Sequence, residues 1–230
     1  MAELAYNVAG SLDAMIVRIG TMFMGEVDAV GAHSVQTKFF VLGVPLVPLS
    51  SVFFTAPGQG IEIPIHARSV LAGYLRLGLG LATLLLGIFA FVTPSYRRGF
   101  DDFAGAIVCG VAFIASFLVL GRVSAGEKAR REILRARTGL AADPAILPTE
   151  LRSTLEGELR GRLEARGVPL RPDAWLALAA GGDGGPYRQQ EAPAIDTATW
   201  CDLYAYARYA SLGDRAWRDA LEPVWAKVAG

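Results

Sequence analysis

The sequence predicts an α+β integral membrane protein with a small antiparallel β module, a two-helix transmembrane hairpin and a C-terminal α-helical domain. Two apolar runs predict the hairpin: Leu71 to Thr93, interrupted once by Arg76, and Phe103 to Gly121. As a helix, the second run rises about 28 Å, close to the ~30 Å hydrocarbon thickness of a bilayer. Two uncharged runs in tandem are unusual for buried helices of a soluble protein. We therefore expect spans at about 71–93 and 103–121, within a membrane domain of residues 69–121.

The distribution of basic residues orients this hairpin. The connecting loop 94–102 holds two arginines, whereas seven basic residues flank the hairpin outside it. Because basic residues concentrate in cytoplasmic loops, both termini should face the cytoplasm. Arg76 lies about one turn inside the first run, from where its guanidinium should reach the membrane interface. The other expected interface anchors, which would meet anionic lipid, are Arg122, Lys128, Arg130 and Arg131.

Small residues form one stripe on each predicted membrane helix. In lipid, helices pack where small side chains let the backbones approach closely. The two stripes, each stepping by three and four residues, are Gly80, Thr83, Gly87 and Ala90 in the first helix and Gly105, Cys109, Ala112 and Ser116 in the second. We interpret them as the seam of an intrachain hairpin. A seam between protomers of a homo-oligomer is the alternative.

Residues 1–68 predict a cytoplasmic β-rich module. Apolar and polar residues alternate through Val35–Val41 and Ile61–Ile65, as in half-buried strands, and Pro64 indicates a sheet edge. The Pro57-Gly58 pair before the latter segment favours a type II turn. With Met15–Met24 and a strand at Val52–Thr55, a sheet of about four antiparallel strands is expected.

The stretch 39–61 carries no charge, so a third membrane helix is an alternative there. Its prolines favour strands over a helix. Within this region the run Thr37 to Leu49, TKFFVLGVPLVPL, resembles a segment of uncharacterised small bacterial membrane proteins. In those proteins a Thr-basic-aromatic strand leads into a Pro-Leu-x-Pro-Leu stretch near transmembrane helices. The resemblance implies β structure and implies no activity.

Residues 122–230 predict a cytoplasmic α-helical domain. We expect the second membrane helix to continue through Gly121 to Thr138, and a separate helix to open at Pro148 and stop at Gly167. Its leucines form one narrow ridge: Leu151, Leu155, Leu159 and Leu163. Two further helices should be capped by Asp196 and Asp214.

Aromatic residues crowd the last two expected helices. They are Trp200, Tyr204, Tyr206, Tyr209, Trp217 and Trp225. We interpret them as the core of a compact helical cap. In the alternative, an exposed aromatic face binds another protein through Trp200, Tyr204, Trp217 and Trp225. The glycine-rich segment 181–186 lacks the Lys-Ser/Thr pair of a P-loop, so it predicts no nucleotide site.

No catalytic signature accompanies these elements. His33 and His66 have no ligand-spaced neighbours, and Cys109 and Cys201 form no metal-binding pair. We therefore predict no catalytic, cofactor-binding or metal-binding residues. The zero net charge argues against a nucleic-acid partner. Arginine outnumbers lysine nineteen to three, which is typical of a GC-rich bacterial genome, and the first twenty residues lack the pattern of a signal peptide.

These observations favour a non-enzymatic, membrane-anchored structural or interaction protein of the bacterial inner membrane, such as an accessory subunit of a larger assembly. Its expected partners are the bilayer and either a second copy of the chain or another membrane protein. A homo-oligomeric channel or transporter subunit is the alternative. A membrane-bound enzyme using the scattered residues Asp173, Asp183 and Tyr187 is the least favoured hypothesis.

Overall fold

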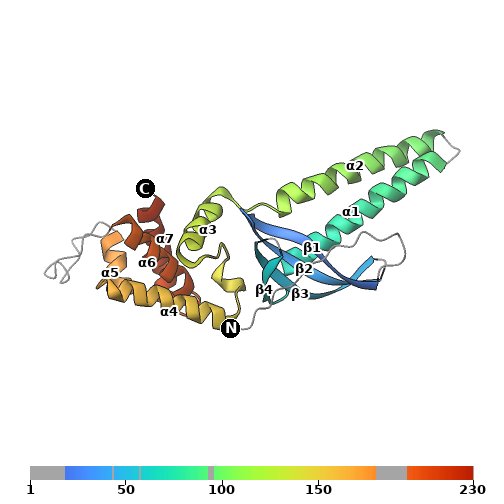
Figure 1. Cartoon of the computed structure of the whole chain (residues 1–230). Coiled ribbons are helices and arrows are strands. Elements are labelled where there is room, and N and C mark those ends of the chain that lie inside the picture. The colour runs from blue at the N-terminus through green and yellow to red at the C-terminus, as the bar shows by residue number, and fades with distance from the viewer. Residues whose placement is uncertain (1–18, 43, 57, 93–95, 180–195, 230) are drawn as a thin grey trace. The chain divides into compact units, whose positions relative to one another are not determined.

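A computed structural model of the chain describes residues 19–42, 44–56, 58–92, 96–179 and 196–229. Within these ranges the fold is α+β, with one four-stranded antiparallel sheet and seven α-helices (Figure 1). The elements are β1 (Ile19–Val30), β2 (His33–Leu42), β3 (Val44–Ala56), β4 (Gln59–Ile63), α1 (Ala67–Val92), α2 (Tyr96–Leu120), α3 (Ala125–Thr138), the 3-10 helix η1 (Pro144–Ile146), α4 (Thr149–Ala165), α5 (Pro172–Ala179), α6 (Thr197–Ala210) and α7 (Arg215–Ala229). The chain divides into two compact units, residues 1–128 and 129–230. Each is described by itself.

The sheet of the first unit is a meander in the order β1-β2-β3-β4. Val27, Val35 and Phe53 stand opposite one another across three strands, and all three are fully buried. Opposite residues of antiparallel strands share a face, so this row forms one layer of the core. The expected alternation is confirmed in β2, where Val35, Phe39 and Val41 are buried, but it does not extend to Ile65, which is exposed after the end of β4. The structure also excludes a third membrane helix at 39–61, because β3 occupies most of that stretch.

Two details of the sheet differ from expectation. β4 ends at Ile63, so Pro64 follows the strand instead of lying on its edge. β1 continues past the expected end at Met24 to Val30, whereas residues 15–18 of the expected strand lie outside the described residues. β1 is also irregular, because its register with β2 shifts between Met24 and Val27. Gly25 has a φ of 73° there, in the left-handed region that glycine adopts without strain.

The helices α1 and α2 form a hairpin that extends beyond the sheet (Figure 1). Both are long and apolar enough to cross a membrane, over Ala67–Val92 and Asp101–Leu120. The first apolar run is confirmed as one helix. The second helix begins at Tyr96, so the expected loop 94–102 is wrong beyond its first residues. Hydropathy detects the apolar part of a helix and not its polar first turns.

The expected continuation from α2 through to Thr138 is also wrong. α2 ends at Leu120 and α3 starts at Ala125. Between them the carbonyl of Gly121 accepts a hydrogen bond from the N–H of Ala29 in β1 at 3.2 Å. A Cβ at Gly121 would lie 2.6 Å from the Phe117 carbonyl oxygen, so only glycine fits this turn. A contact distant in sequence therefore ends the helix.

All regular elements in the described residues of the second unit are helices. α4 packs on α6 through the leucine ridge, in which Leu155, Leu159 and Leu163 are buried. α6 and α5 both pack on α7. The expected ends are confirmed at Pro148, the N-cap of α4, and at Gly167, whose φ is 70°.

Both expected aspartate caps are confirmed. Asp196 accepts a hydrogen bond from the backbone N–H of Thr199 at 2.7 Å, and Asp214 accepts one from Ala216 at 2.8 Å. These bonds satisfy donors that a helix N-terminus leaves unpaired. The hydrogen bonds from Thr199 also lower the pKa of the Asp196 carboxyl, because they favour its charged form. The glycine segment 181–186 lies outside the described residues.

Candidate functional site

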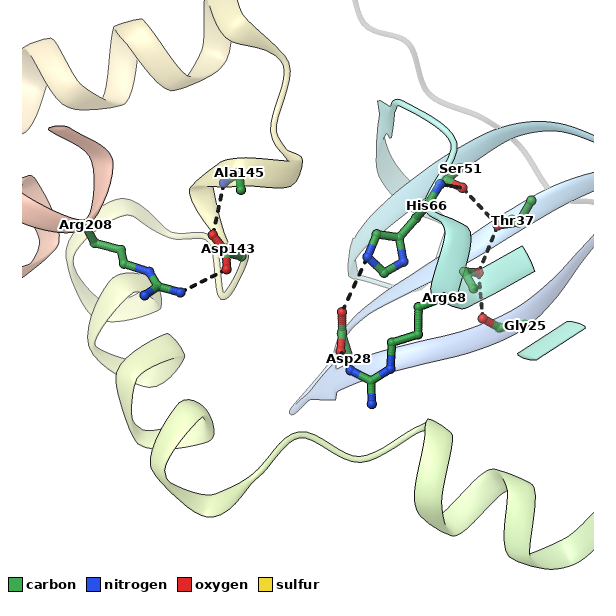
Figure 2. Close-up of polar contacts among 10 residues, drawn as sticks. Gly25, Asp28, Thr37, Ser51, His66, Arg68, Asp143, Ala145 and Arg208 are labelled. Atoms are coloured by element: carbon green, nitrogen blue, oxygen red, sulfur yellow. Dashed lines mark hydrogen bonds and ion pairs between the residues drawn. The ribbon is translucent and has the colours of Figure 1, made fainter. Parts of the chain in front are cut away.

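A buried chain of hydroxyls joins the sheet to the start of α1 (Figure 2). The backbone N–H of His66 donates to Ser51 Oγ, and Ser51 lies 2.9 Å from Thr37 Oγ1. Thr37 donates to Ser69 Oγ at 2.9 Å, and Ser69 donates to the Gly25 carbonyl at 2.6 Å. The three hydroxyl residues are fully buried. Because a buried unpaired hydroxyl is costly, this chain locks three strands and α1 in one arrangement.

A charged cluster lies beside this hydroxyl chain. Arg68 donates to Asp28 Oδ1 at 3.0 Å, and His66 Nε2 lies 3.9 Å from Asp28 Oδ2. Ser51, His66 and Asp28 are the residue types of a hydrolytic triad. The geometry differs from one, because the His66 ring points at Asp28 while its backbone holds the Ser51 hydroxyl (Figure 2). Ser51 is also fully buried, so no substrate reaches it. The cluster supports the fold.

Arg76 connects three elements of the first unit. Its Nη1 donates to the Glu26 carbonyl in β1 at 2.9 Å, and its Nη2 donates to the Ser116 carbonyl in α2 at 3.4 Å. The guanidinium also lies 4.2 Å from the centre of the Phe117 ring. The side chain is 6% exposed. Arg76 is therefore an internal link between the sheet and the hairpin, whereas we expected its guanidinium to reach the membrane interface.

An open groove of about 500 Å³ runs beside Arg76, between β1 and the hairpin. Its walls come from Phe23 and Met24 of β1, from Leu77 to Leu84 of α1, and from Phe113 and Phe117 of α2. Apolar side chains dominate these walls. Phe23 and Met24 of β1 and the apolar residues of α1 therefore line the same space, together with the charged residues Glu26 and Arg76.

The predicted small-residue stripes lie on the facing sides of the hairpin. Gly80 faces Phe113 of α2, Thr83 lies against Gly110, and Gly105 faces Leu86. The helices therefore interlock small residues with large ones. Ser116 is buried, and Ala90, Cys109 and Ala112 are half-buried. Gly87 departs from the stripe, because a Cβ placed there would meet nothing within 4 Å.

Two of the expected lipid anchors are engaged within the second unit. Arg130 forms a two-point ion pair with Glu222 at 2.8 and 2.7 Å and lies over the Trp225 ring. Arg131 is buried. The interface role that we predicted for these two arginines is therefore replaced by packing against their own unit. Arg122 and Lys128 are exposed, as an anchor requires.

The aromatic cluster is mainly core. Tyr204 is fully buried and Trp217 is buried, so neither presents a face to a protein partner. Trp200 and Trp225 are half-buried, and each packs against another ring, Trp175 and Tyr204 respectively. The exposed-face interpretation of Tyr204 and Trp217 is wrong, and the interpretation as a helical cap is confirmed.

A buried carboxylate that the sequence analysis did not single out lies on α6. Asp202 has a side chain 1% exposed and is surrounded by three arginines. Arg166 donates to Asp202 Oδ2 at 2.7 Å, and Arg137 and Arg162 approach the other oxygen at 3.7 and 3.9 Å. This carboxylate ties α3, α4 and α6 together. One signal was available: Asp202 and Thr199 occupy one face of α6, three residues apart.

A second groove, of about 470 Å³, lies on the surface of this unit. α4 contributes Arg160, which donates to the Tyr206 hydroxyl at 3.2 Å, and this bond raises the pKa of Arg160. Leu212 and Asp214 line the other side. Among the described residues of the second unit, Leu212 is the exposed large aliphatic side chain. In this groove the exposed side chain of Leu212 lies among polar residues.

No group of three or more His, Cys, Asp or Glu side chains that could hold a metal ion occurs in the described ranges. Asp173 is exposed and paired with Arg171 at 2.9 Å, while Asp183 and Tyr187 lie outside those ranges. Comparison with protein families, curated proteins and solved structures finds no match for this chain.

Proposed function

We propose that this chain is a non-enzymatic, membrane-anchored interaction protein, in which the α1–α2 hairpin holds the sheet and the helical unit at a bacterial inner membrane. The apolar outer faces of the hairpin carry the proposal. Leu84, Phe89, Val108 and Val119 are examples of its exposed side chains. No charged residue lies near them in either apolar stretch, 77–92 or 103–120. Monomeric soluble proteins rarely expose apolar surfaces of this extent, and lipid would cover them.

The contacts on the inward face of the hairpin favour a structural anchor over a channel or transporter subunit. Arg76 is held by two backbone carbonyls and an aromatic ring, so its charge is not presented to a channel. The facing small and large side chains fill the space between α1 and α2. A closed helix pair fits an anchor better than a pore wall.

We place both termini in the cytoplasm, following the excess of basic residues outside the hairpin. Exposed Arg122, just after α2, and exposed Lys128, in the first turn of α3, would meet anionic lipid headgroups there. The groove beside Leu212 is where we expect a segment of another membrane-associated protein to bind. Arg160 and Asp214 would give that contact its polar specificity.

Two measurements test this function. First, the full chain should resist extraction from membranes by alkaline carbonate, and recovery in the soluble fraction would refute the anchor. Second, a photo-reactive residue at Leu212 should crosslink to a discrete neighbour in native membranes. The matched control is Glu158, which lies on the opposite side of α4 from the groove residues Glu156 and Arg160. Equal crosslinking from both positions, or none from either, would contradict a specific contact at the groove.

A further inference from the structure

We propose that the charge-free end of the sheet is a third membrane-contacting element, which lies in the interfacial layer of the bilayer at the base of the hairpin. This inference rests on the proposed membrane anchor. It concerns residues 19–22 of β1, 39–42 of β2 and 44–49 of β3, none of which is charged. Here this surface is called the sheet tip.

The sheet tip exposes large apolar side chains. They are Met22, Phe40, Leu42, Val47 and Leu49, each between 37 and 51% exposed. Phe40 pairs with Val47 across β2 and β3, so these two share a face, whereas Met22 pairs with Phe39 on the other face. The Phe39 face packs on Gly73 and Tyr74 of α1, while the Phe40 face is exposed and still apolar, where a sheet with one face in water carries polar residues.

In the described sheet, charged residues lie at its middle and at its other end. Glu26, Asp28 and Glu62 lie there, together with Arg68 at the start of α1. Lys38, in register with Phe23 and Ser50, is the last charged residue of β2 before the tip. A boundary between charged and charge-free regions across three strands matches the boundary between water and a bilayer.

The position of the tip relative to α1 provides the geometric argument. Phe23 and Met24 line the same groove as Leu77, Gly80 and Leu84. These helix residues belong to the candidate membrane span. The tip also points to the same side of the unit as the free end of the hairpin (Figure 1). Glu26 and Arg76 also line this groove, nearer the charged end of the sheet. If α1 enters a bilayer, the tip beyond Phe23 is therefore the part of the sheet that we expect to meet its outer layer.

The open sheet edges limit how deep the tip can lie. Toward the tip, residues 44–50 of β3 have no β4 partner among the described residues, so the outer edge of β3 is unpaired there. Unpaired backbone groups are not tolerated in the hydrocarbon core. Pro45 and Pro48 lie on this edge and carry no N–H, which reduces the number of unpaired donors. The interfacial layer, where water still reaches the backbone, is consistent with both observations.

Fluorescence quenching by lipid tests this placement. The full chain carries Cys109→Ser and Cys201→Ser, and single cysteines at Val47, Gln59 and Leu84 receive an environment-sensitive dye in phospholipid nanodiscs. Spin labels near the glycerol end of the acyl chain should quench Val47 several-fold more than Gln59, which begins β4 at the charged end. A second tip position, Leu49, should behave like Val47.

The three positions separate the two proposals. Quenching at Leu84 without quenching at Val47 and Leu49 overturns the sheet-tip inference and leaves the anchor intact. No quenching at Leu84 refutes the membrane anchor itself. Iodide in the water should quench Gln59 strongly and Val47 weakly, and equal iodide quenching at both would also overturn the inference.

Discussion

At the scale of single residues, Gly25 is a position in the contact between β1 and α1 that tolerates no side chain. An alanine Cβ would lie within 3 Å of the Ser69 carbonyl group, and its φ of 73° penalises any other residue. We expect Gly25→Ala to destabilise the first unit by roughly 2–4 kcal/mol, from left-handed strain and overpacking. Pulse proteolysis in urea measures this. Gly20→Ala, on the same strand with nothing within 4 Å, is the control and should change little.

Asp202 gives the corresponding prediction for the second unit. Asp202→Asn removes the negative charge that three arginines share, while the amide retains the volume. We expect a loss of roughly 2–4 kcal/mol, toward the lower end because the arginines keep contact with water. Tryptophan fluorescence during urea unfolding reports it, since all four tryptophans lie in this unit. Asp219→Asn, an exposed carboxylate on α7, should leave the midpoint unchanged, and an equal shift in both variants would contradict the role of Asp202.

Tyr209 predicts a pH dependence in the alkaline range. Burial raises the pKa of its hydroxyl to about 12, from an ordinary value of 10.0. Between these values the unfolded chain releases a proton that the folded chain retains, so stability is complete below pH 10 and falls up to pH 12. The loss should be about 1.4 kcal/mol per pH unit in that window. Urea unfolding at pH 9 and pH 11 should show a smaller loss in Tyr209→Phe than in the natural chain. Equal losses would contradict this prediction.

At the scale of elements, the helix interface predicts different effects for two glycines of one predicted stripe. Gly80→Leu places a side chain against Phe113 and should destabilise the hairpin by roughly 1–3 kcal/mol. Gly87→Leu meets open space, so the monomer should tolerate it. Thermal unfolding in detergent measures both. If Gly87→Leu instead changes the oligomer size while stability is retained, the stripe faces a second protomer.

Much of the element inventory was predictable because periodicity is local. Alternation in Val35–Val41 gave β2, the apolar runs gave α1 and α2, and Asp196 and Asp214 gave two helix starts. The break at Gly121 could not be predicted, because it depends on a hydrogen bond to Ala29, on β1. The role of Arg76 depends likewise on a carbonyl fifty residues away in the chain. Sequence patterns report exposure along one element and do not identify its tertiary partners.

At the scale of the whole molecule, the two compact units suggest two separate roles, one of anchoring and one of binding. The first unit combines the apolar hairpin with a sheet that is locked to it by buried hydroxyls. The second has its own core of leucines and aromatic rings around a shared carboxylate. A unit with its own core keeps its fold when the chain connecting it is cut. The proposed anchor and the proposed binding module should therefore be separable.

Cleavage between the units tests that separation. A specific protease site inserted between Val123 and Ser124, after the bond that ends α2 and before α3, should allow the second unit to be released from membranes. The released fragment should keep the tryptophan emission and the urea midpoint of the intact chain, because all four tryptophans report on that unit. An uncleavable version of the same insertion controls for the added residues. A fragment that stays with the membrane after cleavage would show that the second unit binds the bilayer or the first unit directly. A released fragment with altered emission would show that its core depends on the rest of the chain.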